Sequence, residues 1–358
     1  MVVCVGKGGA STSRLHRERG HQVGWRLDRF KSTGAGDAGL SLVIDSVTKR
    51  FGDVVALDGV SFSVEPGRIF GLLGANGAGK TTSMRIVLDI LRADAGRVTW
   101  KGTENTALPR RTWGYLPEER GLYPKMMVGE QLRFFAALYG VPDATARAEI
   151  DEWLERFRIP EYRERKVEEL SKGNQQKIQF VAAILHDPEV LIMDEPFSGL
   201  DPINVRLLKE AFGEMRDRGK TLIFSTHQME TVEELCESIA IIDVGKVVVS
   251  GAVRDVKRAM GRRVLRLATE GDGNGVDWLT QVPGVEVTAQ REDYVELHVP
   301  TDRDPATILR AALDRGERVT RFEIAEPSLE EIFVEHVGRR AVDESEEHLA
   351  SSSREGAA

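Results

Sequence analysis

A glycine-rich segment that ends in a lysine and two threonines is the part of the sequence best suited to chemistry. In order it reads Gly74, Ala75, Asn76, Gly77, Ala78, Gly79, Lys80, Thr81 and Thr82. Its first eight residues match the pattern G-x-x-x-x-G-K-[ST]. Glycines let the backbone turn with positive φ and bring several N–H groups close to one anion, and a following helix directs its positive end at the same point. We therefore expect a polyphosphate site in which Lys80 reaches the β- and γ-phosphates and the Thr81 hydroxyl binds Mg²⁺.

Two apolar runs elsewhere end in groups that could act on a bound phosphate. Residues 190–193 lead into Asp194 and Glu195, and residues 221–226 lead into His227. Continuous apolar runs are typical of strands buried on both faces of a parallel sheet, whose carboxyl ends open onto a ligand site. Asp194 would hold Mg²⁺ through water, Glu195 would polarise a water aimed at the γ-phosphate, and His227 would sense or stabilise that phosphate. Singly, each has an ordinary explanation as a solvated turn or a surface histidine. Together with the glycine loop they indicate phosphate hydrolysis.

The elements that position these groups follow from the periodicity of apolar residues. Strands are predicted over residues 41–51, 54–64, 69–73, 113–116, 190–195 and 221–227, with a short hairpin over 96–102. Helices are predicted over residues 82–91, in two segments between 129 and 165, after 170–176, and up to about Arg218. The glycine loop is thus preceded by an apolar strand and followed by an amphipathic helix. This context disfavours the alternative of a glycine turn that binds nothing.

Composition limits the classes of protein to be considered. The chain has 358 residues, enough for two or three domains. Its 49 basic and 57 acidic residues give a net charge of -8, so a nucleic-acid partner is not expected. The two cysteines are too few for a disulfide framework, which indicates a reducing cytosol. No apolar run approaches the roughly 18 to 20 residues that span a bilayer. We expect a cytoplasmic protein.

The two ends of the chain differ from its middle. Residues 1–39 combine scattered glycines with Ser, Thr, Arg and His and are predicted to be a disordered extension. A targeting segment is the alternative. Residues 262–337 follow a β-α-β-β-α-β order, which predicts a small α+β domain of ferredoxin-like fold that ends in a helix from Ser328 with a Ser-x-x-Glu cap. Residues 338–358 are acidic and Ser-rich and are predicted to be disordered.

Five motifs together resemble those of one protein family. They are residues 74–82, 170–176, 192–195 and 198–201, and His227. Their order and spacing resemble the ATP-binding subunits of ABC transporters, and among these the ATPases of two-component (ABC-2 type) exporters of the sodium-extrusion and drug-resistance kind. The resemblance covers residues 40–255, with a helical subdomain at about 128–168. It implies an α/β P-loop NTPase fold, ATP and Mg²⁺ as cofactors, and hydrolysis coupled to export. It also implies two partners. One is a second ATPase subunit, identical or related, and the other is a polytopic permease that would hold the chain at the inner face of the cell membrane.

The resemblance also implies further site residues. Ser171, with Lys172 and Gly173, would face the γ-phosphate bound by the other subunit, although the usual Leu-Ser-Gly-Gly-Gln is Leu-Ser-Lys-Gly-Asn here. Asp201 would couple the two sites of the dimer. Phe51 would lie under the adenine, with a core aromatic at a strand end as the alternative.

Glu118 is a departure from the family pattern. The family usually has Gln at this position, and Glu118 replaces its amide donor by a negative charge. Its oxygen would either bind Mg²⁺ or point away.

Two rival functions remain for comparison. A soluble ABC ATPase acting on ribosomes or DNA usually has two cassettes or a long inserted coiled coil, and neither is visible between Thr81 and Ser171. A GTP-dependent switch would need an Asn-Lys-x-Asp motif, which does not occur. The transported substrate depends on the permease and cannot be read from this chain.

Overall fold

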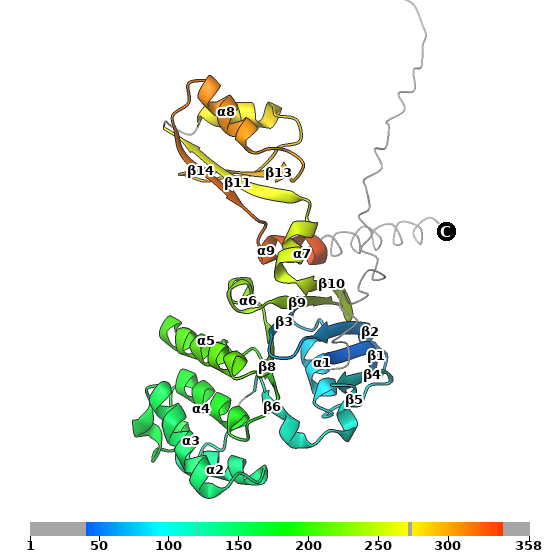
Figure 1. Ribbon diagram of the computed structural model, residues 1–358, viewed down its shortest axis with the longest axis vertical. Coiled ribbons are helices and arrows are strands. Elements are labelled where there is room, and N and C mark those ends of the chain that lie inside the picture. Colours follow the sequence, from blue (N-terminus) through cyan, green and yellow to red (C-terminus); the bar gives the residue numbers. More distant parts are fainter. Residues whose placement is uncertain (1–40, 120, 271–273, 339–358) are drawn as a thin grey trace, which may run out of the picture. The chain divides into compact units, whose positions relative to one another are not determined.

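The computed structural model of the protein describes residues 41–119, 121–270 and 274–338, with only the backbone at 274–277 (Figure 1). These residues belong to one unit, Gly39–Ala358. The predictions for residues 1–39, and for the tail beyond Gly338, lie outside the described residues. These described residues form three sheets, of six, four and four strands.

The six-stranded sheet carries the predicted motifs. Its strands lie in the order β10 (Lys246–Ala252), β9 (Ser238–Asp243), β3 (Ile69–Leu73), β8 (Thr221–Thr226), β7 (Val190–Asp194) and β6 (Trp113–Leu116). From β9 to β6 the neighbours are parallel, and β10 is antiparallel to β9. Parallel strands end at the same edge of a sheet. Leu73 is registered with Thr226 and Asp194 with Ser225, so the glycine loop, the carboxylates and His227 start from one edge.

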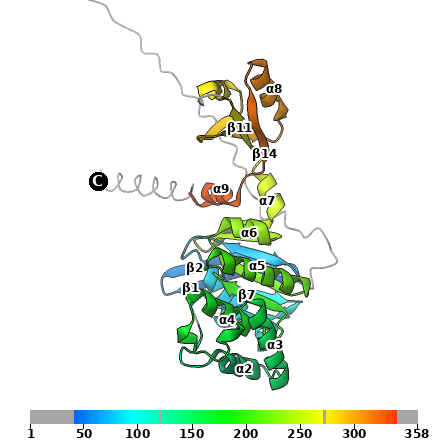
Figure 2. The same cartoon turned by 90° about the vertical axis from the view of Figure 1, so that its left-hand side faces the viewer.

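Both faces of this sheet are covered, which explains its continuous apolar runs. Ile69 and Leu73 point into one core, and Phe70 and Leu72, the alternate residues, point into another. Helices α2 (Val128–Leu138), α3 (Asp143–Arg156), α4 (Lys172–Ile184) and α5 (Pro202–Asp217) build the first core (Figures 1 and 2). The second contains α1 (Lys80–Val87) and an antiparallel sheet in the order β2 (Val54–Val64), β1 (Leu42–Phe51), β4 (Ala95–Trp100) and β5 (Thr103–Glu104).

Several boundaries differ from the sequence prediction. The hairpin expected at 96–102 is present as β4 and β5, which turn at Lys101 and Gly102, but β4 pairs with β5 only at its last two residues and otherwise runs along β1. The helix after the glycine loop ends at Val87 rather than Leu91, because Asp89 takes a positive φ of 52° that an α-helix cannot accommodate. The helical stretch toward 165 ends at Arg156 and continues as two short 3₁₀ turns. Strands β9 and β10 and helices α6 (Met229–Leu235) and α7 (Val253–Ala259) were not predicted.

The third sheet contains the C-terminal strands. Its order is β12 (Glu286–Gln290), β13 (Val295–Pro300), β11 (Arg262–Thr269) and β14 (Val319–Ala325), with every pair antiparallel. A 3₁₀ helix (Asn274–Gln281) and α8 (Ala306–Asp314) fall where the β-α-β-β-α-β order requires them, so this part agrees with the ferredoxin-like prediction. Helix α9 (Leu329–Phe333) follows, with the predicted Ser328 cap.

Candidate nucleotide site

The glycine loop joins β3 to α1 in a shape that requires glycine at two of its positions. Gly79 has a φ of 112°, and an added Cβ would lie 2.6 Å from Leu57 Cδ2 and 2.8 Å from the Ala56 oxygen. At Gly74 a Cβ would lie 2.4 Å from the Ile242 oxygen. Gly77 has a φ of 81° but faces open space. The loop is therefore fitted closely against neighbouring backbone on one side and is open on the other, as phosphate binding requires.

The remaining loop residues divide by exposure. Ala75, Asn76 and Gly77 are exposed, Gly74, Ala78, Gly79 and Lys80 are buried, and Thr81 and Thr82 are half-buried. The Lys80 ammonium donates to the carbonyl oxygens of Gly74, at 2.9 Å, and Ala75, at 3.1 Å. It thus reaches back across the loop, where a polyphosphate would meet it. The Gly245 N–H, which sequence reasoning missed, supports the loop by donating to the Ala78 oxygen at 2.9 Å.

Asp194 is a buried carboxylate held by two hydroxyls. The Thr81 hydroxyl donates to its Oδ2 at 2.6 Å, and the Ser225 hydroxyl donates to its Oδ1. The structure therefore brings the two predicted metal ligands Thr81 and Asp194 together. Carboxylate and hydroxyl oxygens are the donors that Mg²⁺ prefers, so this pair fits the ion. Ser225 was missed because a serine in an apolar strand gives no signal in sequence; only the register of β7 with β8 reveals it.

Glu195 and His227 are also brought together, as predicted. The imidazole Nδ1 of His227 lies 3.1 Å from Glu195 Oε2 and 3.2 Å from Oε1. Glu195 is buried and has a φ of 49°, a strained value for a non-glycine residue. Its N–H donates to the backbone oxygen of Ser225 at 3.2 Å and to the hydroxyl at 3.1 Å, which holds this conformation. The imidazole thus contacts the carboxylate, and Ser225 fixes the backbone that carries it.

Glu118 follows the end of β6 and is exposed. The Gln179 side chain on α4 donates to the flanking oxygens of Pro117, at 3.0 Å, and Glu119, at 3.4 Å, and so holds this segment. Burial raises the pKa of Tyr115, a hydrogen bond from Arg85 opposes this, and the charges of Asp194 and Glu118 raise it further. Both carboxylates therefore act on the same phenol, although Glu118 makes no direct contact with Asp194.

The signature residues form a second group. Ser171 begins α4, and its hydroxyl accepts the Asn174 N–H at 3.3 Å. Ser171 and Lys172 are exposed, whereas Gly173 is buried against Asn204, where a Cβ would lie 3.0 Å from the amide nitrogen. Within the described residues, no hydrogen bond or ion pair joins this group to the glycine loop.

Asp201 belongs to the same group. It begins α5 and accepts the N–H groups of Ile203 and Asn204, each at 3.0 Å. The backbone hydrogen bond from Asn204 is the main cause that lowers the Asp201 pKa. Asn204 therefore connects the signature helix to the Asp201 loop.

Phe51 lies at the end of β1 and is 50% exposed, which argues against the alternative of a core aromatic. The Lys49 ammonium lies 5.6 Å from the centre of its ring.

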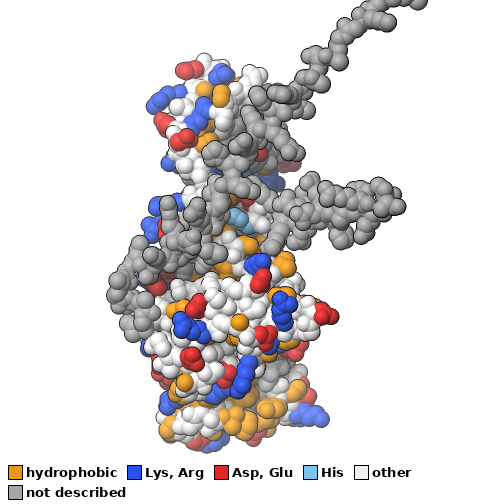
Figure 3. Space-filling view, turned by 90° about the vertical axis from the view of Figure 1, so that its right-hand side faces the viewer, with side chains coloured by type: hydrophobic (Ala, Val, Ile, Leu, Met, Phe, Trp, Pro, Cys, Tyr) orange, Lys and Arg blue, Asp and Glu red, His pale blue; other side chains and the backbone are white. Residues whose placement is uncertain are grey.

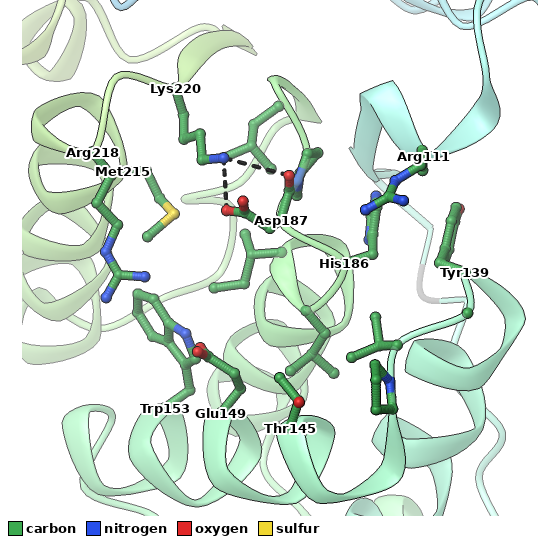
Figure 4. Close-up of a pocket in the computed structure, with 17 residues that line it drawn as sticks. Arg111, Tyr139, Thr145, Glu149, Trp153, His186, Asp187, Met215, Arg218 and Lys220 are labelled. Carbon is green, nitrogen blue, oxygen red and sulfur yellow. Dashed lines mark hydrogen bonds and ion pairs between the residues drawn. The ribbon is translucent and has the colours of Figure 1, made fainter.

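A hollow of about 240 Å³ lies elsewhere and contains none of the predicted site residues (Figure 4). It lies near the starts of β6 and β7, the opposite edge of the sheet from the glycine loop, and is lined by residues that include Tyr139, Trp153, His186 and Arg218. The His186 ring stacks on Tyr139 at 3.9 Å, and its Nε2 lies 2.9 Å from the Trp113 oxygen. This hollow is not part of the nucleotide site.

Comparison with known proteins adds independent evidence. A family model described as ABC transporter matches residues 57–198, and a second, described as ATP-binding protein DrrA1-3-like, C-terminal domain, matches residues 251–337. The uncharacterized ABC transporter ATP-binding protein YhaQ of Bacillus subtilis is 47% identical over 297 residues, which cover 83% of this chain and 98% of YhaQ. The linearmycin resistance ATP-binding protein LnrL of the same bacterium is 32% identical, covering 84% of this chain and 100% of LnrL.

Comparison with solved structures also finds ATP-binding subunits of ABC transporters. One described as the ATP binding subunit of an ABC transporter is 31% identical, with a TM-score of 0.58, and the match covers 62% of this chain and 93% of that one.

Proposed function

This chain belongs to the ATP-binding proteins of ABC transporters, and we propose from that premise that its nucleotide site binds Mg²⁺ and ATP together with a second subunit and thereby drives an exporter permease. The family hydrolyses ATP for transport, and the relatives include export and resistance ATPases. Nothing in the comparisons supports the rival function on ribosomes or DNA.

The observation that carries the proposal is the pairing of Thr81 with Asp194 beside the pairing of Glu195 with His227. Both pairs lie at the edge of the sheet where the glycine loop begins. Lys80 and the loop N–H groups bind the β- and γ-phosphates. Thr81 and Asp194 would hold the metal ion, with Glu118 as a third oxygen donor, and the bound ion would neutralise charge on those phosphates.

Glu195 is the residue that activates water. Its carboxylate lies against the His227 imidazole, and the hydrogen bonds from its N–H to Ser225 fix the backbone, which limits the orientations open to the side chain. A carboxylate held in this way accepts a proton as the water attacks. His227 retains an exposed imidazole face, with 64% of the side chain accessible, that can contact the γ-phosphate.

The second subunit completes the site. Ser171 and Lys172 are exposed, and in the described part of the chain no hydrogen bond or ion pair joins them to their own glycine loop, so they are available to the nucleotide of a partner. The backbone N–H groups at the start of α4 and the Lys172 charge favour an anion there. Asp201, connected to this helix through Asn204, links one site to the other. Phe51 offers its exposed ring to the adenine.

The permease docks on the helical subdomain. Large apolar side chains are exposed on α2 and the segments flanking it: Tyr123, Met127, Phe134, Leu138 and Tyr139. Figure 3 shows hydrophobic side chains gathered at the lower end of the view, where Figure 1 places α2. Exposed apolar patches of this kind mark protein interfaces. No described helix is long and apolar enough to cross a membrane. The permease therefore supplies the membrane path and holds this chain at the inner face.

Replacement of Glu195 by Gln tests the proposal. The amide keeps the shape of the side chain but accepts a proton poorly, so ATP turnover by the purified chain is expected to fall by about 10²- to 10⁴-fold while ATP still binds. The trapped nucleotide should hold two copies together, which size-exclusion chromatography with ATP and Mg²⁺ would detect. Glu65→Gln, at an exposed turn before β3, is the control. A Glu195→Gln protein that keeps its turnover and forms no ATP-dependent dimer would contradict the proposal.

A further inference from the structure

Helix α6 begins two residues after His227. His227 follows the last residue of β8, and only Gln228 separates it from Met229, the first residue of α6. The Gln228 N–H donates to the Thr226 hydroxyl at 3.1 Å, and its carbonyl oxygen accepts the Val232 N–H at 3.4 Å. A seven-residue helix has little stability of its own, so its position is set by the elements packed against it. Any shift of α6 is passed to His227 through one residue.

Helix α9, from the C-terminal part of the chain, is one of those elements. Leu329 and Ile332 are fully buried and belong to the same apolar core as Val232 of α6. Burial of two aliphatic side chains of this size stabilises the contact between α9 and the ATPase core. The C-terminal part thus inserts its last regular helix into the core of the ATPase beside the helix that follows His227.

Glu233 joins three helices at this contact. Its Oε1 accepts the Leu329 N–H at the start of α9 at 2.5 Å, and its Oε2 accepts the Lys257 ammonium of α7 at 2.6 Å. Both side chains are largely shielded, with 28% of Glu233 and 14% of Lys257 exposed. A shielded charged pair with an added backbone hydrogen bond holds its geometry better than an exposed pair. Glu233 is therefore the polar connection of α6 to α7 and α9.

Helix α9 is in turn tied to the C-terminal sheet. The Ser328 hydroxyl accepts the Glu331 N–H at 3.1 Å, and Glu331 Oε2 lies 3.3 Å from Nε2 of His298 on β13. Arg262, the first residue of β11, pairs with Glu335 at 2.6 Å. A continuous set of contacts thus runs from the C-terminal sheet through α9 and Glu233 to α6 and His227.

We propose that Glu233 is a positioning residue for ATP hydrolysis, which holds α9 and α7 against α6 and thereby keeps His227 in place beside Glu195. The inference rests on the proposed roles of His227 and Glu195. It gives the C-terminal part a function, since the ATPase keeps its active arrangement only while α9 is seated. The Glu233 carboxylate contacts Leu329 and Lys257, and its proposed effect on hydrolysis passes through His227.

The first test separates turnover from binding. In the full chain, Glu233→Ala removes both hydrogen bonds and is expected to lower kcat by about 2- to 30-fold, the usual range for coupling between sites. KM for ATP should stay within about 2-fold, because no residue of the glycine loop is touched. Glu233→Gln keeps an oxygen for the Leu329 N–H and should recover part of kcat. Glu230→Gln is the matched control, because Glu230 lies on the same helix, is exposed and has no partner in the described structure.

A double-mutant comparison tests whether the effect of Glu233 on kcat passes through His227. If Glu233 acts through His227, adding Glu233→Ala to a His227→Ala protein should lower kcat no further. Additive losses, or a Glu233→Ala protein with unchanged kcat, would overturn the inference. The proposed function fails separately, if His227→Ala and Glu195→Gln themselves leave turnover intact.

A second variant guards against misfolding at Glu233. Ile332→Ala loosens α9 without touching the polar contacts, and hydrogen exchange of residues 228–236 should rise as kcat falls. Faster exchange with an unchanged kcat would also overturn the inference.

Discussion

Glu118 is the candidate ligand whose charge departs from the family pattern, and its contribution can be measured. In Glu118→Gln the side-chain oxygen remains but a negative charge near the phosphates is lost. We expect the Mg²⁺ concentration for half-maximal ATP turnover to rise and KM for ATP to fall, because a neutral group attracts the cation less and repels the nucleotide less. Titration of ATPase activity with Mg²⁺ at fixed ATP measures the first effect, and the ATP dependence at saturating Mg²⁺ the second.

The control for Glu118 is its neighbour. Glu119→Gln removes the same charge from an adjacent exposed residue and should leave both curves unchanged. Equal curves for Glu118→Gln and the unaltered protein would show that Glu118 points away from the metal.

At the residue scale, the motifs predicted the groups that do chemistry but not those that orient them. Lys80, Thr81, Asp194, Glu195 and His227 were predicted by type and spacing, and the structure brings the last four together as two pairs. Their orienting partner Ser225 could not be predicted, since a hydroxyl inside an apolar strand gains meaning only from the strand beside it. Glu233 was missed for the same reason, because its partners lie 24 and 96 residues further along the chain.

At the element scale, segments with a strong apolar pattern were predicted, whereas strands that are defined by pairing with a distant strand were not. Strand β7 and strand β8 are continuous apolar runs and were found within a residue. Strand β4 was assigned to a local hairpin, because sequence does not reveal that its main partner is β1, about 50 residues earlier. Strands β9 and β10 were not predicted, although the sequence of β9 is as apolar as that of β8.

His186, at the end of α4, makes this part of the fold sensitive to acid. Burial lowers its pKa, so the folded protein binds a proton less readily than the unfolded chain, where histidine titrates near 6.5. Above about pH 6.5 the protonation of His186 therefore does not reduce the free energy of unfolding. As the pH falls further, this free energy decreases by up to about 1.4 kcal/mol per pH unit, until the lowered pKa of His186 in the folded protein is reached. His186→Gln keeps an N–H donor for the Trp113 oxygen and cannot titrate. Urea unfolding at pH 7.5 and 5.5 should show a smaller loss for this variant.

A second variant separates burial from other effects of acid. Tyr139 stacks on the His186 ring and shields it. Tyr139→Ala should hydrate the ring and reduce the acid-dependent loss, even though the variant is less stable at neutral pH. If the unaltered protein and His186→Gln lose equal stability between the two pH values, burial of His186 does not control the acid response.

At the scale of the whole molecule, the order of motifs predicted the family and the ATPase fold. The contact of α9 with the core of the ATPase was seen only in the structure. The C-terminal β-α-β-β-α-β succession predicted its own sheet but not that α9 would seat Leu329 and Ile332 in the core of the ATPase. Those two side chains have ordinary helical spacing, and nothing in the sequence says which apolar core receives them.

The exposed apolar surface on α2 provides a prediction for the assembled transporter. Phe134 is 43% exposed, and its ring contacts those of Tyr123 and Phe135 at 6.3 Å and 5.8 Å between centres. An aspartate at Phe134 would place a charge in the proposed permease contact, and loss of an aromatic anchor from a protein interface typically costs at least about 2 kcal/mol of binding. Phe134→Asp is therefore expected to reduce recovery of the permease with this chain by about 30-fold or more, while basal ATP turnover by the isolated chain is retained. Leu313→Asp, which alters a 55% exposed side chain on α8, is the matched control and should copurify normally. Normal recovery of the permease with Phe134→Asp, combined with loss in Leu313→Asp, would move the docking surface from α2 to the C-terminal part of the chain.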